Sequence, residues 1–181
     1  MVTAAQAVAK TLAAWEVSHV FGLPGGPVLG LIGALDQEGI QFVLVKQENN
    51  AAIMAGTYAR LTGQIGVCLA TGGPGALNFV NGVFHNYLDR EPVLVLTGQF
   101  TLDSVPMITH QRIDHGQIFR PVTKWSTPVH GDHVQNILEK ALRIAVSDRP
   151  GPVHLDFPAN LVATEVAWKP DNPWSQALGL G

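Results

Sequence analysis

The sequence contains one cysteine, Cys68, among its 181 residues. A single thiol cannot form an internal disulfide, and the apolar run around it, residues 65–70, indicates a small buried side chain rather than a nucleophile. A reducing, cytoplasmic location is therefore expected. The N-terminal region also lacks the basic segment and unbroken apolar core of a signal peptide, because Lys10 and Glu16 interrupt it.

Charged residues are scarce as well. Asp, Glu, Lys and Arg make up 14% of the chain, and the formal net charge is -3. This balance gives no reason to expect nucleic acid or an anionic membrane as a partner. No uninterrupted apolar stretch approaches the ~20 residues that a membrane-spanning helix needs. Because 46% of the residues are hydrophobic, we expect part of the surface to be covered by another chain or domain.

Several common catalytic motifs are missing. The sequence has neither the Gly-x-Ser-x-Gly elbow of serine hydrolases nor the Gly-Lys-Ser/Thr of a P-loop. His130 and His133 stand at the start of an expected helix without a third ligand nearby, so zinc is not expected there. His19 and His154 adjoin or lie within expected strands and are interpreted as structural residues.

Hydrophobic periodicity predicts strands that alternate with helices. The expected strands are residues 19–22, 41–45, 65–70, 92–97 and 153–157, with a weaker strand near 122–126. Helices are expected after the capping box at 3–6, after Pro27, and from about residues 51, 76 and 132. Strands that are apolar along their whole length indicate a parallel sheet covered on both faces. The predicted fold is α/β, doubly wound, with a mostly parallel six-stranded sheet.

Two segments do not follow this alternation. Residues 98–118 are long, polar and without clear periodicity, and loops of this length inside a compact domain are usually functional. After Pro158 the chain carries two prolines and two tryptophans in a composition typical of a linker. We therefore expect residues 1–160 to form one domain and residues 161–181 to be a linker or the start of a following domain.

The candidate site lies where ligands bind in open parallel sheets, beyond the carboxyl ends of the strands. Four segments should meet there: residues 24–26, Glu48, residues 71–78, and the long loop with His110, Gln111 and Asp114. Residues 73–78 resemble a dinucleotide fingerprint, but an asparagine replaces the third glycine and no acidic residue ends the next strand. A simple strand-to-helix turn remains an alternative for these residues, and complementing a helix dipole remains one for Glu48.

Four ordered blocks of the sequence resemble one known family. The blocks are "VFGLPGG", "QENNAAIMAGTYARLTGQIGVCLATGGPGALN", "EPVLVLTGQ" and "FRPVTKWS". Together they are similar to the N-terminal pyrimidine-binding domain of thiamine-diphosphate-dependent enzymes, in the superfamily of acetohydroxyacid synthase, pyruvate oxidase and 2-keto-acid decarboxylase. The similarity extends from about Thr3 to Pro158, which is most of the chain.

The resemblance assigns a role to Glu48. In this family a glutamate after the second strand forms a hydrogen bond with the aminopyrimidine ring of the cofactor. A carboxyl group there can share its proton with the ring nitrogen and favour the imino tautomer, whose exocyclic nitrogen removes the C2 proton of the thiazolium. The resemblance also places Gln111 facing the active site, and it implies that the cofactor is contacted by Leu23, Pro24, Gly25, Thr71, Pro74 and Asn78.

Departures from the family pattern concern substrate choice. Gln47 stands where many members have histidine, and the loop reads His110-Gln111-Arg112 where synthases often have Phe-Gln-Glu. The keto acid and the acceptor are therefore left open, as is any use of flavin or acyl-CoA.

A second motif of the family is absent. The Gly-Asp-Gly that binds the cation does not occur, and the segment Gly131-Asp132-His133 does not match it. The resemblance thus implies that Mg2+ and the diphosphate are held by a domain absent from this chain, supplied by a neighbouring subunit of a homodimer or homotetramer.

These features together predict the pyrimidine-binding half of an enzyme that makes or breaks a C–C bond next to the carbonyl of a 2-keto acid. The activity is expected to be most like that of acetolactate synthase, and the chain alone is expected to be inactive. The alternative is a non-catalytic interaction module, or a separately encoded subunit, that keeps the fold. A nucleotide-binding domain is disfavoured because the acidic residue for the ribose is missing.

Overall fold

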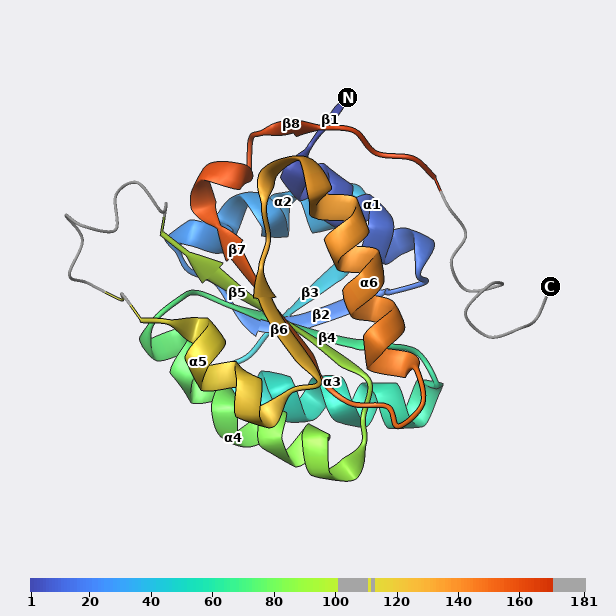
Figure 1. Cartoon of the computed structure of the whole chain (residues 1–181), viewed down its shortest axis with the longest axis vertical. Coiled ribbons are helices and arrows are strands. Elements are labelled where there is room, and N and C mark those ends of the chain that lie inside the picture. The colour runs from blue at the N-terminus through green and yellow to red at the C-terminus, as the bar shows by residue number, and fades with distance from the viewer. Residues whose placement is uncertain (101–110, 112, 171–181) are drawn as a thin grey trace.

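The main sheet has six strands in the order β3-β2-β4-β5-β7-β6, and every neighbouring pair is parallel (Figure 1). The computed structural model describes residues 1–100, 111 and 113–170. The predicted doubly wound α/β fold is confirmed. The strands are β2 (His19–Leu23), β3 (Gln41–Leu44), β4 (Gly66–Ala70), β5 (Val93–Gln99), β6 (Trp125–Pro128) and β7 (Val153–Pro158).

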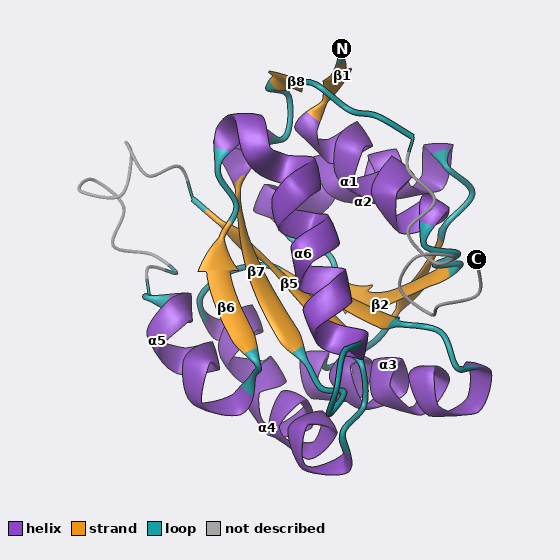
Figure 2. Ribbon diagram, turned by 45° about the vertical axis from the view of Figure 1, so that its right-hand side comes forward, coloured by secondary structure: helices purple, strands orange, loops and turns teal. Residues whose placement is uncertain are grey.

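Helices cover both faces of this sheet (Figures 1 and 2). One face carries α1 (Ala4–Ala14), α2 (Leu29–Gln37) and α6 (Val134–Val146), whereas the other carries α3 (Glu48–Thr62), α4 (Pro74–Asp89) and α5 (His115–Phe119). The buried hydrophobic residues form two clusters accordingly, one under each set of helices. Among the described residues, no helix combines the length and apolar character required to cross a membrane.

Helix ends follow the local sequence signals. Thr3 caps α1: its Oγ1 accepts from the backbone N–H of Gln6 at 3.2 Å, and the Gln6 side chain accepts from the Thr3 N–H at 3.0 Å. This confirms the predicted capping box. The third helix begins at Glu48 rather than near residue 51, because Gln47 still has extended backbone angles. Gly63 ends it in the left-handed conformation, with φ of 74°.

Some elements differ from the sequence prediction. β3 is an edge strand, and its Leu44 is 66% exposed rather than covered on both faces. The weak strand expected near 122–126 lies further on, at β6, after the 3-10 turn η2 (Arg120–Val122). The other 3-10 turns are η1 (Gly26–Val28), η3 (Gly131–His133) and η4 (Ala159–Leu161).

A second, two-stranded sheet joins the two ends of the described chain. β1 (Val2–Thr3) pairs with β8 (Glu165–Val166) in antiparallel fashion. Beyond β8, the indole N–H of Trp168 donates to Thr11 Oγ1 at 3.1 Å, and the backbone N–H of Lys169 donates to the Gln135 side chain. Packing onto α1 and α6 thus extends to residue 169. The predicted domain limit at residue 160 stays a prediction, and residues 171–181 lie outside the described residues.

Candidate active site

The candidate site lies at the point where the strand order reverses. β2 pairs with β3 on one side and with β4 on the other, so the loops that leave β2 and β4 diverge from adjacent strand ends. Leu23 pairs with Ala70 in register, and Pro24 and Gly25 follow it. A Cβ added to Gly25 would lie 2.5 Å from the Cβ of Thr71. Only glycine therefore lets these two loops touch at the strand reversal, which is where folds of this kind have their ligand-binding crevice.

Glu48 lies at this crevice with a defined orientation. It is the first residue of α3, and only 6% of it is exposed. Its Oε2 accepts a hydrogen bond from Asn78 Nδ2, in the second turn of α4, at 3.0 Å. Among the described residues nothing donates to Oε1, which would lie 3.2 Å from a Cβ added to Gly75. The carboxyl thus keeps one oxygen for another partner.

Thr71 adds an unusual polar atom to the crevice. Its Oγ1 is buried and has no hydrogen-bond partner among the residues that the structure describes. Buried hydroxyl groups are normally satisfied, because an unpaired one costs free energy. The methyl group of Thr71 would lie 3.0 Å from a Cβ on Gly75, so the start of α4 leaves no room for a larger residue there.

The turn before α4 brings the long loop to the same edge. Gly73 has a φ of 63°, in the region that favours glycine, and a Cβ added to it would lie 2.6 Å from the Cα of Gln111. Pro74 follows as the first residue of α4. Gln111 is thus in contact with the turn that carries Pro74, whereas His110 and Arg112 lie outside the described residues.

Comparison with known proteins identifies the family. A family model described as "Thiamine pyrophosphate enzyme, N-terminal TPP binding domain" matches residues 2–118. The chain belongs to this family. Thiamine pyrophosphate is another name for thiamine diphosphate, so the match agrees with the resemblance seen in the sequence.

Similar proteins are acetolactate synthases. The chain is 40% identical over 179 residues to an acetolactate synthase of Arthrospira platensis. This alignment covers 96% of this chain and 31% of that protein. It is 40% identical over 164 residues to the acetolactate synthase isozyme 3 large subunit of Escherichia coli (90% and 29%). It is 37% identical over 163 residues to a probable acetolactate synthase large subunit of Methanocaldococcus jannaschii (90% and 28%). The chain spans less than a third of the length of these relatives.

The residues at the strand reversal fit the aminopyrimidine ring that this thiamine pyrophosphate family binds. A nitrogen of the pyrimidine ring can form a hydrogen bond with a carboxyl group. Glu48 has one oxygen without a described donor. The unpaired Thr71 hydroxyl offers a further polar contact. The glycines at 25 and 75 let the backbone of both turns approach Thr71 closely, since a Cβ at either position would contact its side chain. Glu48, Asn78 and Thr71 could therefore hold the ring.

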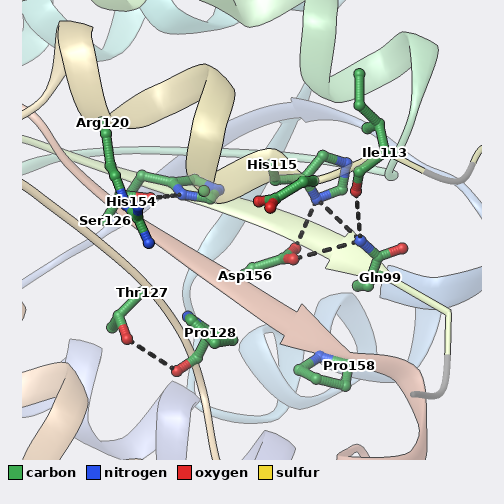
Figure 3. Close-up of a pocket in the computed structure, with 12 residues that line it drawn as sticks. Gln99, Ile113, His115, Arg120, Ser126, Thr127, Pro128, His154, Asp156 and Pro158 are labelled. Atoms are coloured by element: carbon green, nitrogen blue, oxygen red, sulfur yellow. Dashed lines mark hydrogen bonds and ion pairs between the residues drawn. The ribbon is translucent and has the colours of Figure 1, made fainter. Parts of the chain in front are cut away.

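A buried polar network lies beside the site and was not recognised from the sequence. His115 Nδ1 lies 2.9 Å from Asp156 Oδ1, and Thr97 Oγ1 donates to the same oxygen at 2.8 Å. Thr97 Oγ1 is also 2.8 Å from His154 Nε2. His154 Nδ1 is 2.8 Å from Ser126 Oγ (Figure 3). His154 is thus a satisfied structural residue, as predicted. The rest of the network could have been found from the polar residues that interrupt the apolar strands β5 and β7.

This network forms one wall of a cavity of about 590 Å³. The cavity lies along β6 and β7 and reaches the end of β5, and Arg120 and Gln99 are among its lining residues (Figure 3). Asp114, which the sequence placed at the common edge, lines the same cavity and caps α5 by accepting from the Gln117 N–H at 3.0 Å. Asp114 therefore has a local structural role here.

The titration of His154 predicts a pH-dependent stability. Burial lowers the pKa of His154 from 6.5 to about 3, and this outweighs the opposing effect of Asp156. The unfolded chain therefore binds a proton that the folded chain excludes between these two values. The contribution of neutral His154 to stability is complete above pH 6.5 and falls as the pH drops toward 3, by up to about 1.4 kcal/mol per pH unit.

Urea unfolding of His154→Gln at pH 7 and pH 5 measures this contribution. The variant should lose less stability than the wild type between these pH values, because glutamine does not titrate. The same change at the exposed His130 is the matched control and should leave the wild-type pH dependence. Equal pH dependence in wild type and His154→Gln would contradict the prediction.

Proposed function

We propose that this chain is the pyrimidine-binding half of a thiamine-diphosphate-dependent enzyme of the acetolactate synthase type. The reaction would make or break a C–C bond next to the carbonyl of a 2-keto acid, as a transferase or lyase in the cytoplasm. The observation that carries this proposal is the buried Glu48, held by Asn78 at the strand reversal with its second oxygen available.

The proposal assigns a role to each of the residues named at the site. When bound, thiamine diphosphate supplies the weakly acidic C2–H of its thiazolium ring and an electron sink for the bond next to the carbonyl. Glu48 would share a proton with the pyrimidine nitrogen of the bound cofactor, while Asn78 holds the carboxyl group through Oε2. The loops at Leu23, Pro24 and Pro74 would contact the ring, and Gln111 would face the substrate side.

The proposal requires a second domain. Mg2+ and the diphosphate would be bound by a cation-binding domain of a neighbouring subunit, because the Gly-Asp-Gly motif of the family does not occur in this sequence. Helix α4 carries exposed apolar residues that could contact a neighbouring copy of this chain in a homodimer or homotetramer. They are Leu77, Phe84, Tyr87 and Leu88, between 38% and 59% exposed. Several large apolar residues exposed along one helix would form an interface where another subunit covers them.

Calorimetry with and without the second domain tests the half-site proposal. We expect the chain alone, with Mg2+ present, to bind thiamine diphosphate more weakly than about 1 mM, because the charged diphosphate lacks its cation site. Supplying the cation-binding domain, in the same polypeptide or as a partner, should bring binding into the micromolar range. Micromolar binding by the chain alone would refute the half-site. No gain with the domain present would favour the non-catalytic interaction module instead.

A further inference from the structure

His115 lies outside the crevice yet touches the turn that opens α4. The backbone N–H of Gly73 donates to His115 Nε2 at 3.0 Å, and His115 is only 1% exposed. A Cβ added to the neighbouring Gly72 would lie 3.1 Å from the Cε1 of the same ring and 2.4 Å from the carbonyl oxygen of Gly98. The imidazole therefore packs directly against the turn and supplies the acceptor for its central amide.

The protonation of the His115 ring follows from its partners. Because the Gly73 N–H is a donor, Nε2 must be the unprotonated acceptor, and Nδ1 carries the proton that faces Asp156 Oδ1 at 2.9 Å. Gln99 Nε2 lies 3.4 Å from the other oxygen of Asp156 and donates to it. Asp156 thus selects the tautomer in which His115 can accept from the turn.

The rest of the network agrees with this assignment. Thr97 donates its only hydroxyl proton to Asp156, so it must accept from His154 Nε2–H, and His154 Nδ1 must accept from the Ser126 hydroxyl. A neutral His154 is required for this arrangement, and burial lowers its pKa to about 3. Each group in the series therefore donates to the next, from Ser126 through His154 and Thr97 to Asp156. Asp156 also accepts the hydrogen bond from His115.

The turn at Gly73 determines where the first two turns of α4 lie. Gly73 is the residue before Pro74, and the Leu77 N–H donates to the Gly73 carbonyl at 3.0 Å. Asn78 comes one residue later and donates to Glu48 Oε2. A shift of the Gly73 backbone N–H would thus move the side-chain amide of Asn78, which orients the Glu48 carboxyl group.

We infer that His115, with its tautomer set by Asp156, is a positioning residue that holds the Gly73 turn and thereby aligns Asn78 with Glu48. This inference rests on the proposed function, because the alignment matters only if Glu48 acts on the cofactor. His115 itself does not touch the reacting atoms. Its loss should therefore change the rate of the proton transfer rather than abolish folding or cofactor binding.

A pair of substitutions separates this role from packing. His115→Gln keeps an acceptor near the position of Nε2, whereas His115→Met keeps a similar volume without a comparable acceptor. In the chain assembled with the cation-binding domain, His115→Met should slow exchange of the cofactor C2 proton by roughly 10- to 100-fold, the cost of misplacing reacting groups by ~1 Å or less. His115→Gln should restore most of the wild-type rate. Equal rates in the Met variant and the wild type would overturn the inference.

Nuclear magnetic resonance of the wild-type chain provides a test that requires neither activity nor a folded variant. The ring-nitrogen shifts of His115 should show a protonated Nδ1 and an unprotonated Nε2, and the Gly73 amide should be protected from hydrogen exchange. A protonated Nε2, or a Gly73 amide that exchanges at the rate of an open loop, would refute the inference. Glu48→Gln separates the two proposals: normal C2 exchange in that variant rejects the proposed function, whereas slow exchange there with normal exchange in His115→Met rejects only the positioning role.

Discussion

Glu48→Gln is expected to slow exchange of the thiamine diphosphate C2 proton by roughly 10²–10⁴-fold, the usual scale for loss of an acid–base group. Glutamine keeps the size of the side chain and an oxygen that can accept from Asn78, but it has no proton to share with the pyrimidine ring. The measurement is deuterium exchange at C2, followed by acid quench and NMR, on the chain assembled with its cation-binding domain. Cofactor affinity should change far less, because the diphosphate is anchored elsewhere.

The control and the competing explanation are both well defined. The same substitution at the exposed Glu165 should leave C2 exchange unchanged. If Glu48 only complements the dipole of α3, Glu48→Gln should cost about 1 kcal/mol of stability or less and leave the exchange rate near that of the wild type. Exchange at the wild-type rate would therefore assign Glu48 a purely structural role and refute the proposed function.

Phe79→Ala is expected to lower the free energy of unfolding by about 3–5 kcal/mol. Phe79 lies on α4, is fully buried, and packs in the cluster that holds α3 and α4 on the sheet. Its removal would leave a cavity in that cluster, close to the helix turn that carries Asn78. Urea unfolding monitored by circular dichroism measures the loss, and a change below about 1 kcal/mol would show that the cluster collapses around the site.

Phe84→Ala provides the matched control on the same helix. Phe84 is 43% exposed. At concentrations where the chain is monomeric, the substitution should change stability by only about 0.5 kcal/mol. At high concentration it should weaken the self-association measured by sedimentation, because α4 presents Phe84 to the proposed partner. Unchanged self-association would remove Phe84 from the interface, and a wild-type chain that stays monomeric would contradict the homodimer.

Much of the fold could be predicted because its signals are local. The capping box at Thr3, the glycine that ends α3 and the apolar strands each depend on a few neighbouring residues. The order of the strands is not local information. The position of β7 between β5 and β6, and the exposure of β3 at an edge, follow from packing between segments far apart in the sequence.

The candidate site was predictable in part for the same reason. Glu48, Thr71 and Asn78 follow strand ends at recognisable positions, and the structure brings them together. The contribution of His115 was not predictable, because its partners Gly73 and Asp156 lie 42 and 41 residues away in the chain. The catalytic and cofactor-binding roles of the residues named from the sequence stay predictions.

The strand order also bears on how the chain folds as it is synthesised. Among the residues that the structure describes, β6 has β7 as its only neighbour in the sheet, and β5 has β7 on the side away from β4. During synthesis β5 and β6 leave the ribosome before β7, at about 5–20 residues per second. A nascent chain that has been made only as far as α6 therefore has one edge of β5 and one edge of β6 without a partner. Both edges are paired when β7 inserts between them.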